Sequence, residues 1–361
     1  MKVAIVHDWL TNYGGAERVL QAICSLFPDA PVYTVVYDEK KMHRYFGDKK
    51  IYTSYIQKMP LGVKKYTSYL PLLPGAVERW DLSEYDLVIS SSTCCAKGVL
   101  TRADAIHICY CATPMRYAWD FYFRYMESSG KIKRFLIPFL MKNIRIWDAI
   151  SANRVDRFIA NSHNVANRIR KHYRRDAMVI YPFADTEFYT PGNTNGDYYL
   201  VVSRLVEYKR IDIAVKALTK LGKPLVIVGE GRELEQLKKI AGKNVTFAGW
   251  CTNEQIRDYY RGCKAFLFPG EEDFGITPVE SQACGRPVIA YGKGGALETV
   301  VADKTGVFFP EQTVESLTDA VVKFESMTFD KDEIRKNALR FSRDKFISDM
   351  KSFVEETLSV A

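Results

Sequence analysis

The segment that decides the fold is YYLVVSRLVEYKRIDIAVKALTKLGKPLVIV, residues 198–228. It begins with a short run of large apolar residues, which has the length and composition of a buried strand. A polar loop follows, then apolar residues at helical spacing over 211–221 and a second buried run at 225–228. Strand, helix and strand in succession predict a βαβ unit, whose two strands run parallel.

The same alternation continues towards the C-terminus. The first strand of this half is expected at 198–202, and further strands are expected at 245–248, 265–268 and 287–290. Thr252 and Gln255 have the spacing of a capping box, and the next helix is expected to begin at Thr277, with Pro278 at its first position. The apolar pattern of residues 330–358 predicts a helical tail that packs on its own domain or crosses back to the first one.

The first half of the chain repeats this organisation less regularly. Strands are expected at 2–7, 87–90, 106–109, 157–160 and 179–183, with a helix over 16–27 and a linker over 184–196, which contains Pro191-Gly192 and Asn195-Gly196. The pattern predicts an α/β protein of two doubly wound, Rossmann-like domains, 1–183 and 184–340, with a C-terminal helix over 341–361. Ligands of such domains bind outside the carboxyl ends of the strands, so we expect a cleft there, between the two domains.

Composition excludes several classes of protein. The 361 residues are 47% hydrophobic and 26% charged, which is ordinary for a globular chain. The longest apolar stretch, 135–141, is far shorter than a membrane-spanning helix, and the N-terminus has no signal-peptide layout. Eight cysteines in a chain of this length favour reduced, buried thiols, and a cytoplasmic location is the default.

The net charge of +8 is concentrated in the first half. Residues 1–183 contain 27 Lys and Arg against 16 Asp and Glu, whereas the remaining residues are slightly acidic. This asymmetry predicts an anionic partner for the first half: a nucleic acid, a phosphorylated substrate or an anionic membrane surface. Residues 58–74 and 131–147 mix basic, aromatic and aliphatic residues, as interfacial membrane segments do, although a core helix with a solvated basic face has the same composition. No nucleic-acid-binding module is recognised.

Chemistry-bearing residues follow three strands of the second half. Ser203, Arg204 and Lys209 follow the first strand, and two cations there suit a diphosphate, although a plain basic surface loop is the alternative. Glu272 and Glu280 follow the strand at 265–268, and carboxylates accept hydrogen bonds from sugar hydroxyls; Glu280 has a second interpretation, as the partner of Thr277 in a capping box.

Glycines supply backbone N–H groups at two helix starts. Gly294 and Gly295, in Gly292-Lys-Gly-Gly295, follow the last strand, and Gly14-Gly15 follows the first strand of the N-terminal half. Such positions bind anions. His107 lies inside an expected strand and is interpreted as a hydrogen-bonded core histidine.

Arg204 with Lys209, then Glu272-Asp-Phe-Gly-Ile-Thr-Pro-Val-Glu280, then Gly294-Gly295 resemble the donor site of retaining glycosyltransferases of the GT-B fold, sequence family 4. Gly14-Gly-Ala-Glu-Arg18 and Tyr110-Cys-Ala-Thr-Pro-Met-Arg-Tyr-Ala-Trp-Asp120 are similar, more narrowly, to bacterial O-antigen mannosyltransferases. The resemblance covers nearly the whole chain.

The resemblance implies a role for each matching residue. Arg204 and Lys209 would hold the donor diphosphate, and Glu280 would bind the ribose hydroxyls. Glu272 would meet the donor sugar together with the backbone of Phe274, Gly275 and Ile276. Gly15 would approach the diphosphate from the first domain. Arg204, Lys209 and Glu272 are therefore the expected catalytic residues.

The implied reaction needs no metal and no cofactor. A hexose, mannose from GDP-mannose, would pass with retention to a lipid-linked saccharide in the synthesis of a bacterial surface polysaccharide. The enzyme would be peripheral on the inner face of the cytoplasmic membrane, with no nucleic-acid partner. A UDP-sugar donor and a sugar-nucleotide epimerase of the same architecture are the alternatives.

Two positions depart from the family pattern. Asp273 stands where many relatives have glycine, and Ala112 stands where the family usually has histidine, in Cys-His-Thr-Pro. That histidine would contact the donor sugar, and alanine can neither donate a hydrogen bond nor transfer a proton. A catalytically impaired protein is therefore a third alternative.

Overall fold

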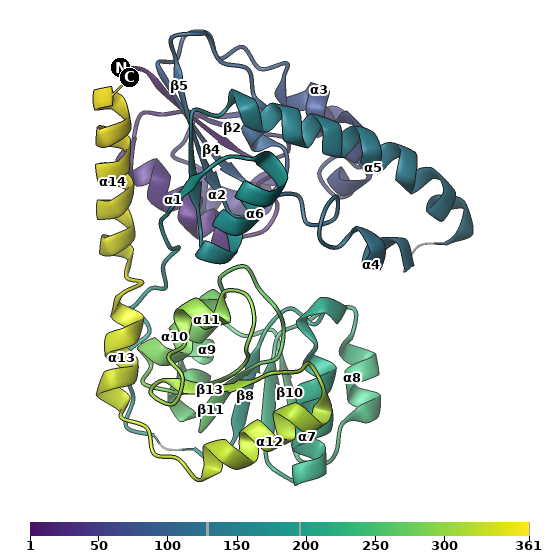
Figure 1. Cartoon of the computed structure of the whole chain (residues 1–361), viewed down its shortest axis with the longest axis vertical. Helices are drawn as coiled ribbons and strands as arrows, with labels where there is room; N and C mark the ends of the chain where they lie inside the picture. Colours follow the sequence, from purple (N-terminus) through teal and green to yellow (C-terminus); the bar gives the residue numbers. More distant parts are fainter. Residues whose placement is uncertain (128–129, 195, 361) are drawn as a thin grey trace. The chain divides into compact units, whose positions relative to one another are not determined.

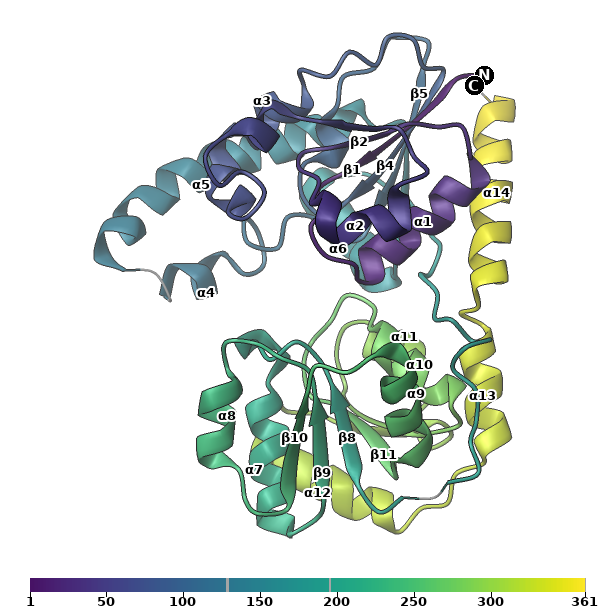
Figure 2. The same cartoon turned by 180° about the vertical axis from the view of Figure 1, so that it is seen from behind.

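The computed structural model describes residues 1–127, 130–194 and 196–360, so Asn195 of the expected linker lies outside the described residues. Two compact units form: residues 1–181 with 347–361, and residues 182–346. Each unit contains one parallel sheet flanked by helices (Figures 1 and 2). The two doubly wound, Rossmann-like sheets that the sequence predicted are confirmed.

The first unit is built on a seven-stranded sheet of order β3-β2-β1-β4-β5-β6-β7. Its strands are β1 Val3–His7, β2 Val32–Thr34, β3 Ile51–Thr53, β4 Leu87–Ser92, β5 Ile106–Cys111, β6 Arg157–Ala160 and β7 Ala177–Val179. Its α-helices are α1 Gly15–Leu26, α2 Glu39–Phe46, α3 Leu73–Val77, α4 Tyr122–Glu127, α5 Lys131–Ser151 and α6 His163–Tyr173. Its 3-10 helices are η1 Tyr55–Lys58, η2 Tyr66–Leu72, η3 Ala96–Gly98 and η4 Ala152–Arg154.

The second unit has a six-stranded sheet of order β10-β9-β8-β11-β12-β13. Its strands are β8 Tyr199–Val202, β9 Leu225–Val228, β10 Val245–Gly249, β11 Ala265–Phe268, β12 Val288–Tyr291 and β13 Gly306–Phe309. Its helices are η5 Glu207–Lys209, α7 Ile211–Leu221, α8 Leu234–Ile240, α9 Asn253–Gly262, α10 Ile276–Ala283, α11 Ala296–Thr299, α12 Val314–Glu325 and α13 Lys331–Leu339. Helices α7, α8 and α12 cover one face of the sheet and pack their apolar residues into its core (Figure 1).

The C-terminal tail is helical, as predicted, and consists of α13 and one further helix. The last helix, α14, spans Arg343–Val360, and its residues from Ile347 onward belong to the first unit. There the Arg157 guanidinium pairs with the Glu356 carboxylate at 3.6 Å and lies 5.3 Å from the ring centre of Phe353. These contacts attach the end of the chain to β6.

The core of the first unit contains a buried ion pair. The ammonium of Lys97 donates to the Asp148 carboxylate at 2.6 Å and to the Ser151 hydroxyl at 3.0 Å. The other Asp148 oxygen accepts hydrogen bonds from the Trp119 indole and the Tyr173 hydroxyl at 2.7 and 2.9 Å. Burial lowers the pKa of Lys97, but the Asp148 carboxylate more than offsets this and leaves that pKa above its ordinary value. Lys97 therefore keeps its positive charge inside the protein.

His107 of β5 is a core histidine, as expected. Its Nε2 lies 2.8 Å from the Ser90 hydroxyl on the neighbouring strand, and the side chain is fully buried. Burial disfavours the imidazolium and lowers the pKa of His107 to about 4.

Acid is expected to destabilise the first unit through His107. The unfolded chain, whose histidine pKa is about 6.5, binds the extra proton first. The free energy of unfolding therefore falls as the pH drops below about 6.5 and continues to fall down to the folded pKa, by about 3 kcal/mol in all. Urea unfolding of wild type and His107→Leu between pH 7 and pH 4 measures this contribution. The unfolding free energy should depend less on pH in His107→Leu than in wild type. It should keep the wild-type dependence in His43→Leu, which removes an exposed histidine. Equal dependence on pH in all three proteins would contradict the assignment.

Candidate functional site

The predicted donor-site residues of the second unit gather along one edge of its sheet. Arg204 and Lys209 follow β8, Glu272 follows β11, and Gly294 follows β12. These three strands are neighbours in the sheet order, and they run parallel, so their carboxyl ends meet. The order of the sheet reverses between β8 and β11, which is where ligands bind in doubly wound folds.

Lys209 and Glu272 form the central contact of this edge. The Lys209 ammonium pairs with the Glu272 carboxylate, and the two side chains are only 20% and 17% exposed. The hydroxyl of Tyr208 lies 3.3 Å from the Arg204 guanidinium, and the Lys209 ammonium lies 5.4 Å from the ring centre of Tyr208. Arg204 itself is exposed. The two cations therefore flank one tyrosine, and one of them already holds a carboxylate.

The loop after β11 packs backbone against backbone on the loop after β12. The N–H of Gly295 donates to the Glu272 carbonyl at 2.9 Å, and Glu272 and Gly294 form a parallel bridge. A Cβ at Gly294, whose φ is +65°, would lie 2.4 Å from the Glu272 oxygen, and a Cβ at Gly295 would lie 2.3 Å from the Phe274 Cα. No side chain fits at either position, so both glycines are required to hold the Glu272 loop in place.

The first helical residue of α10 is Ile276, two residues before the expected Pro278, and its N-cap is Gly275 at φ +88°. Pro278 is therefore its third residue, and the interpretation of Thr277 and Glu280 as a capping box is wrong. The Phe274 side chain is buried, with its ring 5.4 Å from that of Phe341. Phe274 therefore has only its backbone left to meet a ligand at the start of α10.

Glu280 lies inside α10 and is 4% exposed. Its Oε2 accepts a hydrogen bond from the Tyr260 hydroxyl of α9 at 3.3 Å. Tyr260 is a contact that the sequence analysis missed, because nothing in the pattern of α9 distinguishes it from an ordinary core tyrosine. The structure joins Lys209, Glu272, Gly294 and Gly295 directly, whereas the contact described for Glu280 leads to α9.

The predicted residues of the first unit occupy the corresponding edge of its sheet. Gly14 is the N-cap of α1, its N–H donates to the Glu17 carboxylate at 2.9 Å, and Gly15 is the first residue of that helix. Ala112 directly follows β5 and is partly exposed, and its N–H donates to the Ser92 carbonyl at 2.9 Å. A site shared by the two units stays a prediction.

Asp8 organises this edge and was not among the predicted residues. It is buried directly after β1, and its carboxylate accepts hydrogen bonds from the backbone N–H groups of Cys94, Cys95 and Ala96 at 2.7 to 2.9 Å. The signal available in the sequence was an acid immediately after a buried strand. Asp8 holds the loop after β4 against the end of β1.

The described residues contain no group of three His, Cys, Asp or Glu side chains placed to hold a metal ion. Metal independence stays a prediction. Within the same described part of the chain, no helix combines the length and the apolar character needed to cross a bilayer.

Family models match both halves of the chain. Residues 13–188 match the model described as Glycosyltransferase Family 4, and residues 185–341 match the model described as Glycosyl transferases group 1. The boundary between the two matches lies close to the boundary between the two units.

Curated relatives match over part of the chain. An uncharacterized glycosyltransferase of Methanocaldococcus jannaschii, MJ1178, is 24% identical over 215 residues, which are 56% of this chain and 60% of that protein. The GDP-mannose-dependent alpha-(1-6)-phosphatidylinositol monomannoside mannosyltransferase of Mycobacterium tuberculosis is 36% identical over 140 residues, which are 34% of this chain and 36% of that protein. The chain thus spans about half the length of the curated relatives it matches.

Solved structures match over the full length. Anabaena Alr3699/HepE, crystallised in complex with UDP and glucose, has a TM-score of 0.73 at 20% identity, with 100% of both chains covered. At 20% sequence identity, this match shows that the two proteins share a fold.

Proposed function

We propose that this chain, which has the α/β GT-B fold and whose two halves match glycosyltransferase family models, is a glycosyltransferase that moves a hexose from a nucleoside-diphosphate sugar to a hydroxyl group. The observation that carries the proposal is the contact between Lys209 and Glu272 at the carboxyl ends of β8 and β11. This contact supports the proposal because a cation suits a diphosphate, a carboxylate suits sugar hydroxyls, and both lie at the switch point of the sheet.

The chemistry follows from where charge develops. The bond between the anomeric carbon and the diphosphate oxygen breaks, and the oxygen of the acceptor hydroxyl forms the new bond to that carbon. The leaving diphosphate gains negative charge, which Arg204 and Lys209 stabilise. The acceptor proton passes to the departing diphosphate oxygen, so attack on the same face gives retention. Glu272 as a covalent nucleophile is the alternative route to retention.

The proposed donor is GDP-mannose. The support is the Mycobacterium tuberculosis relative, whose name states that it depends on GDP-mannose. The proposed acceptor is a lipid-linked saccharide in surface polysaccharide synthesis. The basic and apolar segments 58–74 and 131–147 support this acceptor, and with it a peripheral position on the anionic inner face of the cytoplasmic membrane.

A UDP-sugar is the second candidate donor. The specific observation in its favour is the full-length match to Alr3699/HepE, which was crystallised with UDP and glucose. Thermal unfolding with GDP, UDP or ADP discriminates the candidates, because a ligand at about 100 times its Kd adds about 2.7 kcal/mol of stability. A shift with GDP alone supports GDP-mannose, a shift with UDP alone replaces it, and no shift with any nucleotide contradicts the proposal.

Ala112→His is expected to raise the rate of transfer by about 10-fold to 100-fold. Ala112 follows β5 at the carboxyl edge of the first sheet, and an imidazole there adds a hydrogen-bond donor that alanine lacks. Turnover of both proteins with GDP-mannose and acceptor measures the effect, and Ala112→Leu, which has no side-chain donor, controls for the added volume. An unchanged rate in Ala112→His would remove this position from the catalytic site.

A further inference from the structure

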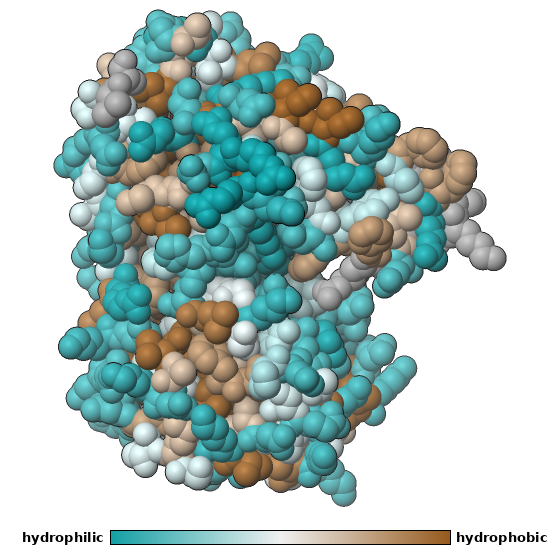
Figure 3. All heavy atoms as spheres, in the orientation of Figure 1, coloured by the Kyte–Doolittle hydropathy of each residue, from teal (hydrophilic) through white to brown (hydrophobic). Residues whose placement is uncertain are grey.

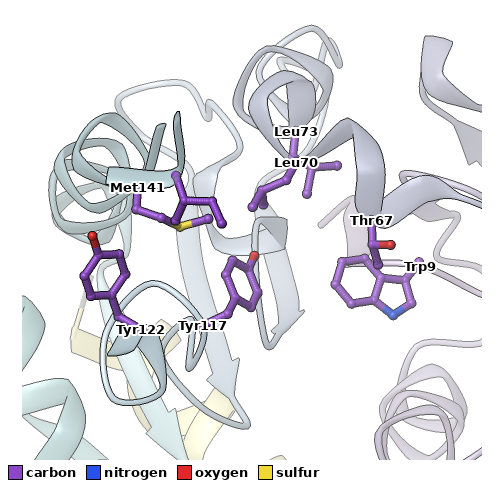
Figure 4. Close-up of a pocket in the computed structure, with 8 residues that line it drawn as sticks. Trp9, Thr67, Leu70, Leu73, Tyr117, Tyr122 and Met141 are labelled. Atoms are coloured by element: carbon purple, nitrogen blue, oxygen red, sulfur yellow. The ribbon is translucent and has the colours of Figure 1, made fainter. Parts of the chain in front are cut away.

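A cavity of about 390 Å³ lies in the first unit, and all of its described lining residues belong to that unit. Its walls come from η2, α3, α4, α5 and the loop after β5, and none of the described residues that line it is charged. Figure 4 shows Tyr117 between Met141 and Tyr122 on one side and Trp9 on the other. The volume is that of a small-molecule site, and the walls suit a hydrocarbon.

Two of the lining residues connect this cavity to the reactive edge of the first sheet. Trp9 lies between the end of β1 and Gly14, and Tyr117 lies in the loop that begins at Ala112. A chain bound in the cavity would therefore lie against the two loops that carry Gly14 and Ala112.

The segments that line the cavity are strongly basic. Residues 49–77 and residues 128–147 each contain five Lys or Arg and no Asp or Glu. Lys64 and Lys65, which precede η2, have exposed side chains, and the Arg145 guanidinium lies 4.8 Å from the ring centre of Tyr122 in the cavity wall. An apolar cavity bordered by cations suits a molecule with a hydrocarbon chain on one side of a phosphate.

The outer surface of α5 also combines apolar and basic residues. Phe135 and Phe139 are 72% and 65% exposed, and Figure 3 shows hydrophobic side chains among hydrophilic ones on this unit. Exposed phenylalanines beside lysines are typical of a segment at the bilayer boundary. The helix that lines the cavity with Ile137 and Met141 therefore also carries the exposed apolar residues best suited to contact a membrane.

We propose that this cavity binds the hydrocarbon chain of the phosphate-linked lipid that carries the acceptor saccharide. Thr67, Leu70, Ile137 and Met141 contact the chain, and the surrounding cations hold the phosphate. The inference rests on the proposed function for the identity of the acceptor, but chain binding itself requires neither donor nor transfer.

Calorimetric titration of the full chain with farnesyl phosphate, below its micelle concentration, tests this directly. Wild type is expected to bind farnesyl phosphate and to give no heat with inorganic phosphate. Ile137→Trp, which fills the cavity, should weaken binding at least 10-fold. Ile150→Trp is the matched control, because it makes the same substitution at an exposed position of the same helix. Thermal unfolding of both variants checks that each is folded.

The outcomes separate this inference from the proposed function. Farnesyl phosphate binding that depends on residue 137 supports the cavity even if no transfer is detected, in which case only the proposed function fails. Equal weakening by both tryptophan variants would assign binding to the surface of α5, and would overturn the inference. So would transfer to a chain-bearing acceptor that Ile137→Trp leaves unchanged.

Discussion

Lys209→Ala is expected to lower turnover by about 100-fold to 1000-fold, the usual cost of removing one group that stabilises charge developing in the transition state. Lys209 is the cation that contacts Glu272, so it lies where the diphosphate and the sugar of the donor would meet. The loss should fall on kcat more than on KM, because the leaving diphosphate is more negative in the transition state than in the bound donor. Initial rates over a range of donor concentrations separate the two.

The matched control is Lys323→Ala, which removes an exposed lysine of α12 whose partner is Asp303 at 2.8 Å. It should leave turnover unchanged. Arg204→Ala should lower turnover in the same direction as Lys209→Ala, since both cations flank Tyr208. If Lys209→Ala and Arg204→Ala both retained nearly full rate, their assignment to the leaving diphosphate would be wrong.

Asp148→Ala is expected to reduce the free energy of unfolding by about 3–5 kcal/mol, because it leaves the Lys97 ammonium buried without its counter-charge. The exposed fractions of the two side chains are 1% for Lys97 and 0% for Asp148, so water cannot replace the lost carboxylate. The indole of Trp119 and the hydroxyl of Tyr173 lose their acceptor in the same step. Urea unfolding at pH 7 measures the loss.

A second variant separates the effect of the unpaired charge on stability from the effect of lost packing. Lys97→Met with Asp148→Asn removes both charges and keeps the volumes similar, so it should be less destabilising than Asp148→Ala alone. Asp104→Ala, at an exposed carboxylate paired with Arg102 at 2.7 Å, should cost under about 1 kcal/mol. A loss of similar size for Asp104→Ala and Asp148→Ala would contradict the role given to burial.

Several elements were predictable because their local signals are strong. The strand at 157–160 and the capping box of Thr252 and Gln255 are found as expected, since a short apolar run and a reciprocal cap depend on a few adjacent residues. Strands β2 and β3 were missed because three residues are too few to show a period.

Other elements were misplaced where a single residue changes the backbone. The strand expected at 179–183 lies instead at Ala177–Val179, because Pro182 has no N–H to donate to a neighbouring strand. The start of α10 at Ile276 depends on the left-handed backbone of Gly275. The sequence pattern instead favoured Thr277 as the N-cap, because Pro278 follows it.

The amino-acid sequence alone determined the α/β class, the two Rossmann-like sheets and the loops on which the chemistry-bearing residues lie, because strand and helix periodicity are properties of neighbouring residues. Only the tertiary structure decided which of those residues touch: that Lys209 meets Glu272, that Glu280 meets Tyr260 in the core, and that α5 and η2 enclose an apolar cavity. Parallel strands bring distant loops to one edge, and the partners found there depend on strand order and on glycine contacts that no local pattern contains.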